Sequence, residues 1–219
     1  MSTTIEAVVF DVGETLIDES RIWERWATRL GVTPFTLLGA VGAMAALDRS
    51  HLDALKLVKP DFDLATERER WAAEEPDSLR ENFDEEDLYA DVRPALDALQ
   101  AIALSTWIAG NQPVAARQAL MAMDLPVRSI INSSDLGAEK PDPLFFGAVA
   151  AAVGVEAAHI LYVGDRLDND VLPARAAGMR TVLIRRGPWG YLHASRPEAE
   201  KADAICDSLL EVPAVAGSM

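Results

Sequence analysis

The stretch from Val8 to Leu16, VVFDVGETL, constrains the fold more than any other part of the chain. Its β-branched and aromatic run ends at Asp11, and Gly13 follows two positions later. Such a run is typical of a strand buried in a parallel sheet. Open α/β sheets hold their ligand crevice at the carboxyl ends of the strands. Asp11 is therefore a candidate site residue, although an aspartate there can equally be a turn residue.

The chain after Asp91 alternates between strand and helix patterns. We expect a helix near Val171 with Asp170 as its N-cap, because Pro173 fits only the first turn. The last residues, Val212 to Met219, have the pattern of a frayed tail. The alternation predicts an α/β fold with a doubly wound, mostly parallel, Rossmann-like sheet. The strands predicted here are Ala103–Ala109, Ser129–Asn132, His159–Val163 and Arg180–Ile184.

The segment from Ile17 to Tyr89 interrupts this alternation. It shows helical spacing and no strand alternation, and Thr33-Pro34 is an N-cap followed by a proline suited to the first helical position. An insertion directly after Asp11 would overhang the crevice. We therefore predict a core of residues 1–16 and 90–219 and a helical cap of residues 17–89.

Composition excludes several functional classes. The formal net charge of −15 in 219 residues argues against nucleic acid, whose phosphates need clustered cations. An anionic substrate would need a local cation or metal to reverse the potential. The single cysteine, Cys206, excludes an intramolecular disulfide and a cysteine metal cluster. We find neither a membrane-spanning run nor a signal peptide and expect a cytoplasmic protein. The oligomeric state has no signal in the sequence.

Several polar residues follow the predicted strands or lie in adjoining loops. Carboxylates at neighbouring strand ends suit Mg²⁺, which prefers oxygen ligands. A lysine nearby supplies a point charge for an oxyanion such as phosphate, and a carboxylate beside both can act as a nucleophile. Each residue alone could instead be a helix cap, a solvent lysine or a turn former. Their joint occurrence favours a site made of Asp11, Asn111, Lys140, Asp165 and Asp170.

Three motifs resemble those of the haloacid dehalogenase-like (HAD) hydrolase superfamily. FDVGETL is similar to its first motif, GAEKPDPLFF to its lysine motif and VGDRLDNDVLPARAAGM to its acidic fourth motif. The resemblance covers the core from Ile5 to about Leu210. The helical segment after the first motif resembles the family's C1-type cap.

The resemblance implies a role for each matching residue. Asp11 would be the nucleophile and a metal ligand, and Gly13 would offer its backbone carbonyl to Mg²⁺. Lys140 would steady the nucleophile and the phosphoryl group. Asp165 would complete the metal shell, and Asp170 would be a metal ligand through water or an outer partner. The predicted substrate-binding residues are Gly110, Asn111 and Lys140, and the predicted substrate is a small phosphorylated metabolite.

Two departures from the family pattern leave alternatives open. Family phosphatases usually carry a second aspartate, as general acid and base, where this chain has Gly13. They usually offer Ser or Thr where this chain has Gly110. Glu14 could replace the missing acid, although it lies one residue out of register. The alternatives to a Mg²⁺-dependent phosphatase are a metal-independent dehalogenase-type hydrolase and a catalytically silent binding or regulatory protein. The acidic pair Asp165 and Asp170 argues against the dehalogenase.

Overall fold

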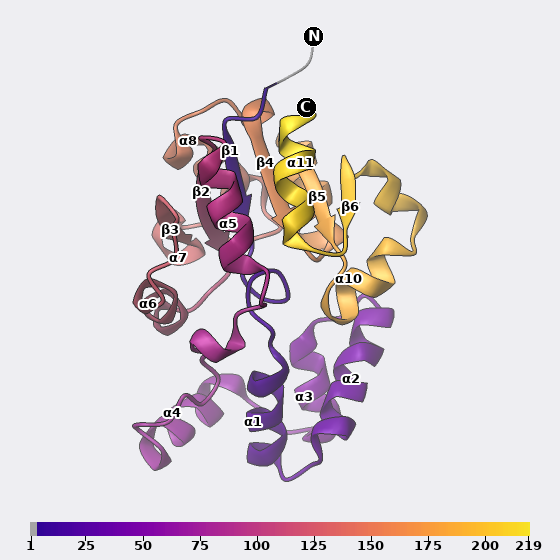
Figure 1. Cartoon of the computed structure of the whole chain (residues 1–219). Helices are drawn as coiled ribbons and strands as arrows, with labels where there is room; N and C mark the ends of the chain where they lie inside the picture. Colours follow the sequence, from indigo (N-terminus) through magenta and orange to yellow (C-terminus); the bar gives the residue numbers. More distant parts are fainter. Residues whose placement is uncertain (1–3) are drawn as a thin grey trace. The chain divides into compact units, whose positions relative to one another are not determined.

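The computed structural model describes residues 4–219 and divides the chain into two compact units (Figure 1). The first unit contains the chain up to Asp18 together with Leu88–Met219, and the second contains Glu19–Asp87. The second unit begins and ends two residues inside the predicted insertion, 17–89. Its role as a cap stays a prediction.

The first unit is built on a sheet of six parallel strands in the order β3-β2-β1-β4-β5-β6. The predicted doubly wound parallel fold is thereby confirmed. The chain adds β2 and β3 on one side of β1, then returns to add β4, β5 and β6 on the other. The order therefore reverses between β1 and β4, where such sheets bind ligands. The strands are β1 (Ala7–Phe10), β2 (Ser105–Gly110), β3 (Ser129–Asn132), β4 (Ile160–Gly164), β5 (Arg180–Ile184) and β6 (Ala204–Cys206).

Helices cover both faces of this sheet. On one face α5 (Val92–Ala101) packs against β2 and against α11 (Val212–Gly217), and Figure 1 shows these two helices side by side. The other face carries α8 (Pro143–Val153), which contacts α9 (Leu172–Ala176). The remaining helices of this unit are α6 (Val114–Ala122), α7 (Ser133–Leu136), α10 (Gly187–Ala194) and the short turns Ala157–His159, Leu167–Val171, Pro197–Lys201 and Leu209–Glu211.

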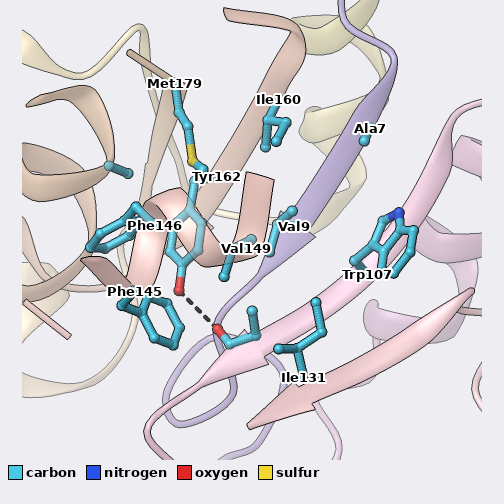
Figure 2. Packing of buried hydrophobic residues seen from close by; sticks show 12 residues of the cluster. Ala7, Val9, Trp107, Ile131, Phe145, Phe146, Val149, Ile160, Tyr162 and Met179 are labelled. Atoms are coloured by element: carbon cyan, nitrogen blue, oxygen red, sulfur yellow. Dashed lines mark hydrogen bonds between the residues drawn. The ribbon is translucent and has the colours of Figure 1, made fainter. Parts of the chain in front are cut away.

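The core between the sheet and α8 follows from strand alternation. Ala7 and Val9 of β1 face this layer, where they join the fully buried aromatic rings of Phe145, Phe146 and Tyr162 (Figure 2). The rings of Phe146 and Tyr162 pack edge to face with their centroids 5.3 Å apart. The Tyr162 hydroxyl donates to the Ala109 carbonyl at 2.8 Å, so its polar group is satisfied inside the core. This packing fixes β1, β2 and β4 relative to α8.

The second unit contains α1 (Ser20–Leu30), α2 (Pro34–Ala46), α3 (His51–Val58), α4 (Leu64–Glu74) and the short turn Glu85–Asp87. Gly31 ends α1 in the left-handed conformation, and the Thr33 hydroxyl caps α2 by accepting from the Thr36 amide at 3.2 Å. The Trp26 ring packs edge to face on Phe62 and Trp71 in the core of this unit.

No single helix within residues 4–219 combines the length and the apolar character needed to cross a membrane. Among these described residues, one pair of helices, α1 and α2, meets the length and apolarity criteria when taken together, and the pair is bent by 114°.

The expected frayed tail at Val212–Met219 is wrong. This segment forms α11, in which Val212 and Ala216 are buried against the first unit. A capping box precedes it, because Ser208 accepts from the Leu210 amide and Glu211 accepts from the Ser208 amide. The four-residue spacing of Val212 and Ala216 was the available sequence signal.

Candidate active site

Asp11 lies immediately after β1, at the carboxyl edge of the sheet. Its amide donates to the Val163 carbonyl of β4 at 2.9 Å, which holds the side chain beside the reversal point. The chain then turns sharply, because the amides of Leu16 and Ile17 both donate to the Val12 carbonyl. Asp11 is buried in the described structure, so its carboxylate sits in a site with little water.

Lys140 places its ammonium group between two carboxylates. Its Nζ lies 2.6 Å from Asp11 Oδ1 and 2.6 Å from Asp170 Oδ1. Burial alone would lower the pKa of Lys140, but the charges of Asp11 and Asp170 outweigh it and hold the pKa well above its ordinary value. Lys140 therefore stays charged at neutral pH.

The side chain of Asn111 holds the backbone of this lysine. Its Nδ2 donates to the Lys140 carbonyl at 2.8 Å, and its Oδ1 accepts from the Lys140 amide at 2.8 Å. Both ends of the amide are thus used within the protein. The side chain of Asn111 positions Lys140, and substrate binding at Gly110 and Asn111 stays a prediction.

Asp170 is not the helix N-cap that the sequence suggested. It lies within the π-helical turn Leu167–Val171, which precedes α9. A turn of i→i+5 bonds accommodates one residue more than an α-helical turn. Asp170 therefore points back toward the sheet, where it accepts from the Arg166 amide at 3.0 Å and from Lys140. The His193 ring anchors the turn by accepting from the Leu167 amide at 2.9 Å.

Asp11, Asp165 and Asp170 form a buried cluster of acids. One oxygen of each lies within 4.8 Å of the others. Burial raises the pKa of Asp165 well above its ordinary value, and the charges of Asp170 and Asp11 raise it further. Burial also raises the pKa of Asp170 to about 6, although Lys140 opposes the shift. Three acids and one lysine therefore leave this site with an excess of negative charge.

A divalent cation fits this donor set. Three carboxylates supply hard oxygen ligands of the kind that Mg²⁺ prefers, and two neighbouring strand ends provide Asp11 and Asp165. Gly164 makes room for the third carboxylate, that of Asp170, because a Cβ at position 164 would lie 2.5 Å from Asp170 Cγ. A cation would offset both the burial and the repulsion between acids that raise the pKa values of Asp165 and Asp170.

The absence of a side chain at Gly110 also has a steric explanation. A Cβ at this position would lie 2.7 Å from Asp11 Oδ1, closer than real Cβ contacts allow. A Ser or Thr here would therefore require the Asp11 carboxylate to move. The glycine that departs from the family pattern is matched to the observed orientation of Asp11.

Sequence reasoning missed two residues that brace the loop after Asp11. Arg186 Nη1 donates to the Thr15 carbonyl at 2.7 Å, and Arg186 also pairs with Asp91. Its guanidinium carbon lies 4.1 Å from the centre of the Tyr89 ring, whose hydroxyl donates to Glu14 Oε2 at 2.6 Å. Neither residue belongs to a local motif, so only the fold reveals their proximity.

Of the residues proposed from sequence, the structure brings Asp11, Lys140, Asp165 and Asp170 into one cluster. Gly13 lies in the loop after Asp11, where it pairs with Ile17 in an isolated bridge.

The arrangement can be compared with known families. The family model for haloacid dehalogenase-like hydrolases matches residues 5–178, which is most of the chain. The chain belongs to the haloacid dehalogenase-like hydrolase family. The resemblance inferred from the three motifs is thus confirmed, and the family is one of hydrolases.

Curated relatives and solved structures extend the comparison. A glyceraldehyde 3-phosphate phosphatase of Methanopyrus kandleri is 47% identical over 60 residues, which are 27% of this chain and 26% of that protein. Phosphatase MT3486 of Mycobacterium tuberculosis is 37% identical over 102 residues, covering 45% of this chain and 46% of that protein. The matches thus span between about a quarter and a half of these relatives.

The crystal structure of the HAD-hydrolase YfnB from Bacillus subtilis bound to magnesium has a TM-score of 0.70. It is 17% identical and covers 97% of this chain and 99% of that one. At this identity the likeness establishes the fold.

Proposed function

We propose that this hydrolase is a Mg²⁺-dependent phosphatase that acts on a small phosphorylated metabolite through an aspartyl-phosphate on Asp11. The observation that carries the proposal is the contact of the Lys140 ammonium with both Asp11 and Asp170, beside Asp165. The names of the phosphatase relatives agree with this reaction class.

In the first half-reaction a carboxylate oxygen of Asp11 attacks phosphorus. The bond from phosphorus to the leaving oxygen breaks, and that oxygen departs with the bonding electrons. Lys140, held by Asn111, keeps the attacking carboxylate in place and offers positive charge to the phosphoryl oxygens. Mg²⁺ bound by Asp11, Asp165, Asp170 and the Gly13 carbonyl would neutralise charge on the phosphoryl group.

In the second half-reaction water attacks phosphorus in the aspartyl-phosphate. The bond between phosphorus and the Asp11 oxygen breaks, the carboxylate is regenerated and inorganic phosphate leaves. The water gives up its proton to a base or to solvent.

The dehalogenase alternative is disfavoured by charge. Attack on a carbon–halogen bond makes no use of two further carboxylates beside the nucleophile. Without a metal, the net negative charge of Asp11, Asp165, Asp170 and Lys140 would repel a substrate that is itself an acid, whereas the proposed phosphatase has Mg²⁺ to reverse this charge. The same buried charge also argues against a catalytically silent protein, because an unused cluster of this kind is costly to retain.

An assay for released phosphate and released halide separates the candidates. The protein should release phosphate from small phosphate esters and acyl phosphates in the presence of Mg²⁺, and EDTA should abolish the release. Asp11→Asn should be inactive, whereas Asp97→Asn on the exposed face of α5 should retain activity. Metal-independent halide release would favour the dehalogenase, and no release of either product would favour the binding protein.

A further inference from the structure

Three features fix the side chain of Glu14. Its backbone adopts a φ of 50°, a left-handed conformation that non-glycine residues rarely occupy. The Tyr89 hydroxyl donates to Glu14 Oε2 at 2.6 Å. Gly187, itself at a φ of 57°, leaves the space that the carboxylate occupies, because a Cβ there would lie 2.6 Å from Glu14 Cγ and 2.8 Å from Oε2. The acid is therefore held in one place.

The strand order shows where this place is. Glu14 follows β1, and its carboxylate lies against Gly187, which follows β5. Because β4 lies between β1 and β5, the loop after β1 and the Glu14 side chain together span the carboxyl end of β4, which Asp165 follows. In agreement with this placement, the charge of Glu14 contributes to the raised pKa of Asp165, after burial and the charges of Asp170 and Asp11.

The bracing of Tyr89 supports the same arrangement. Its ring lies under the guanidinium of Arg186, which is anchored to the Thr15 carbonyl and to Asp91. Burial and the charge of Glu14 raise the pKa of Tyr89, so its hydroxyl remains a proton donor to the carboxylate. The contacts that hold Glu14 in place thus extend from the loop after β1 to the loop after β5.

We propose that Glu14 is a positioning residue of the cation site that accepts hydrogen bonds from water in the hydration shell of the bound Mg²⁺. Asp11, Asp165 and Asp170 form the direct donor set, and the half-buried Glu14 is close enough for its charge to act on Asp165. Mg²⁺ dehydrates reluctantly and keeps several waters, so a fixed acid beside the ligands has water to hold. The inference rests on the proposed Mg²⁺ site.

Glu14→Gln tests it, because glutamine keeps the shape and still accepts from Tyr89 but carries no charge. The control is Glu156→Gln, which removes one exposed charge at the opposite end of β4. Mg²⁺ affinity is measured by titration calorimetry, and melting temperature is measured with and without Mg²⁺. Glu14→Gln should weaken Mg²⁺ binding ~10-fold, as is typical when an outer partner of a metal ligand is lost. Tyr89→Phe, which removes only the hydroxyl, should weaken it less.

The two melting temperatures distinguish positioning from a structural role. Removal of a charge beside three acids should leave the metal-free melting temperature of Glu14→Gln unchanged or raised, while the increase caused by Mg²⁺ becomes smaller. A lowered metal-free melting temperature with unchanged Mg²⁺ affinity would overturn the inference, as would affinities equal to that of Glu156→Gln. If the unaltered protein bound no Mg²⁺, the proposed function would fail first and the inference with it.

Discussion

Lys140 is the residue on which the electrostatics of the site depend. It is the cation between Asp11 and Asp170, and it is almost completely buried. Removing one partner of such a buried pair leaves an uncompensated buried charge. This destabilises the fold more than replacing the whole pair by apolar residues would. The third acid, Asp165, has no such contact with Lys140 and is the carboxylate whose charge most needs a metal.

The raised pKa of Asp170 predicts how stability depends on pH in the absence of metal. Its pKa is about 6 in the folded chain, compared with 3.8 for an ordinary aspartate. The folded state therefore binds this proton more tightly, and the free energy of unfolding should fall as the pH rises from 4 to about 6. Asp170→Asn should flatten this decrease in urea titrations across that range, whereas Asp97→Asn should not. An equal slope in Asp170→Asn would contradict the assignment.

Gly13 predicts the kind of leaving group that the enzyme tolerates. A glycine supplies no side-chain proton, so acyl and aryl phosphates should be better substrates than alkyl esters, which leave as poor alkoxides. Gly13→Asp should add an acid and raise kcat/KM for alkyl phosphates by up to ~10²-fold, with a smaller gain for acetyl phosphate. The variant must first show a native circular dichroism spectrum and a Mg²⁺-dependent rise in melting temperature. No gain on any ester by such a variant would refute the missing-acid account.

At the scale of elements, each acid of the site comes from a strand end or from the turn that follows it. Five of the six strands and the alternation of strands with helices were predictable, because apolar runs and glycine stops are local signals. The short strand β6 was not predicted. A shared site for Asp11, Lys140 and Asp170 was predicted from their places after the strands, whereas the contact of Lys140 with both acids is seen only in the fold. The π-helical turn at Asp170 could not be predicted, since a single additional residue has no signature in hydrophobic spacing. Nor could the bracing of Glu14 by Tyr89, which is 75 residues away.

The start of α8 offers a test of how local capping supports the site. Asp142 Oδ1 accepts from the Leu144 amide at 2.9 Å, two residues after Lys140. Asp142→Ala should lower the free energy of unfolding by ~1 kcal/mol, because the amide loses its partner. Asp142→Asn retains an acceptor and should lie close to the unaltered protein in the same denaturation experiment. Equal losses in both variants would indicate that charge, and not capping, matters at this position.

At the scale of the whole molecule, the chain crosses twice between its two units. The connections run side by side, since Ile17 pairs with Leu88 and the Tyr89 amide donates to the Leu16 carbonyl at 3.0 Å. Both lie directly beyond the loop that carries Asp11 and Glu14. A change at the site can therefore reach both connections through a few residues.

This arrangement predicts that residues 17–89 act as a cap whose position responds to ligand. Closure of such elements excludes water from the reaction. Hydrogen exchange should show increased protection near Ile17 and Leu88 when Mg²⁺ and BeF₃⁻, a phosphate mimic, are added together. Mg²⁺ alone serves as the control. Unchanged exchange at both connections would count against a gating role.

Covalent catalysis by Asp11 is tested most directly by trapping the phosphoenzyme. The protein is mixed with radiolabelled acetyl phosphate and Mg²⁺, quenched in acid and digested, and the label is located by mass spectrometry. We expect one phosphoryl group on Asp11, formed only with Mg²⁺ and absent from Asp11→Asn. Rapid release of phosphate with no label on Asp11, or an equal label in Asp11→Asn, would contradict the account.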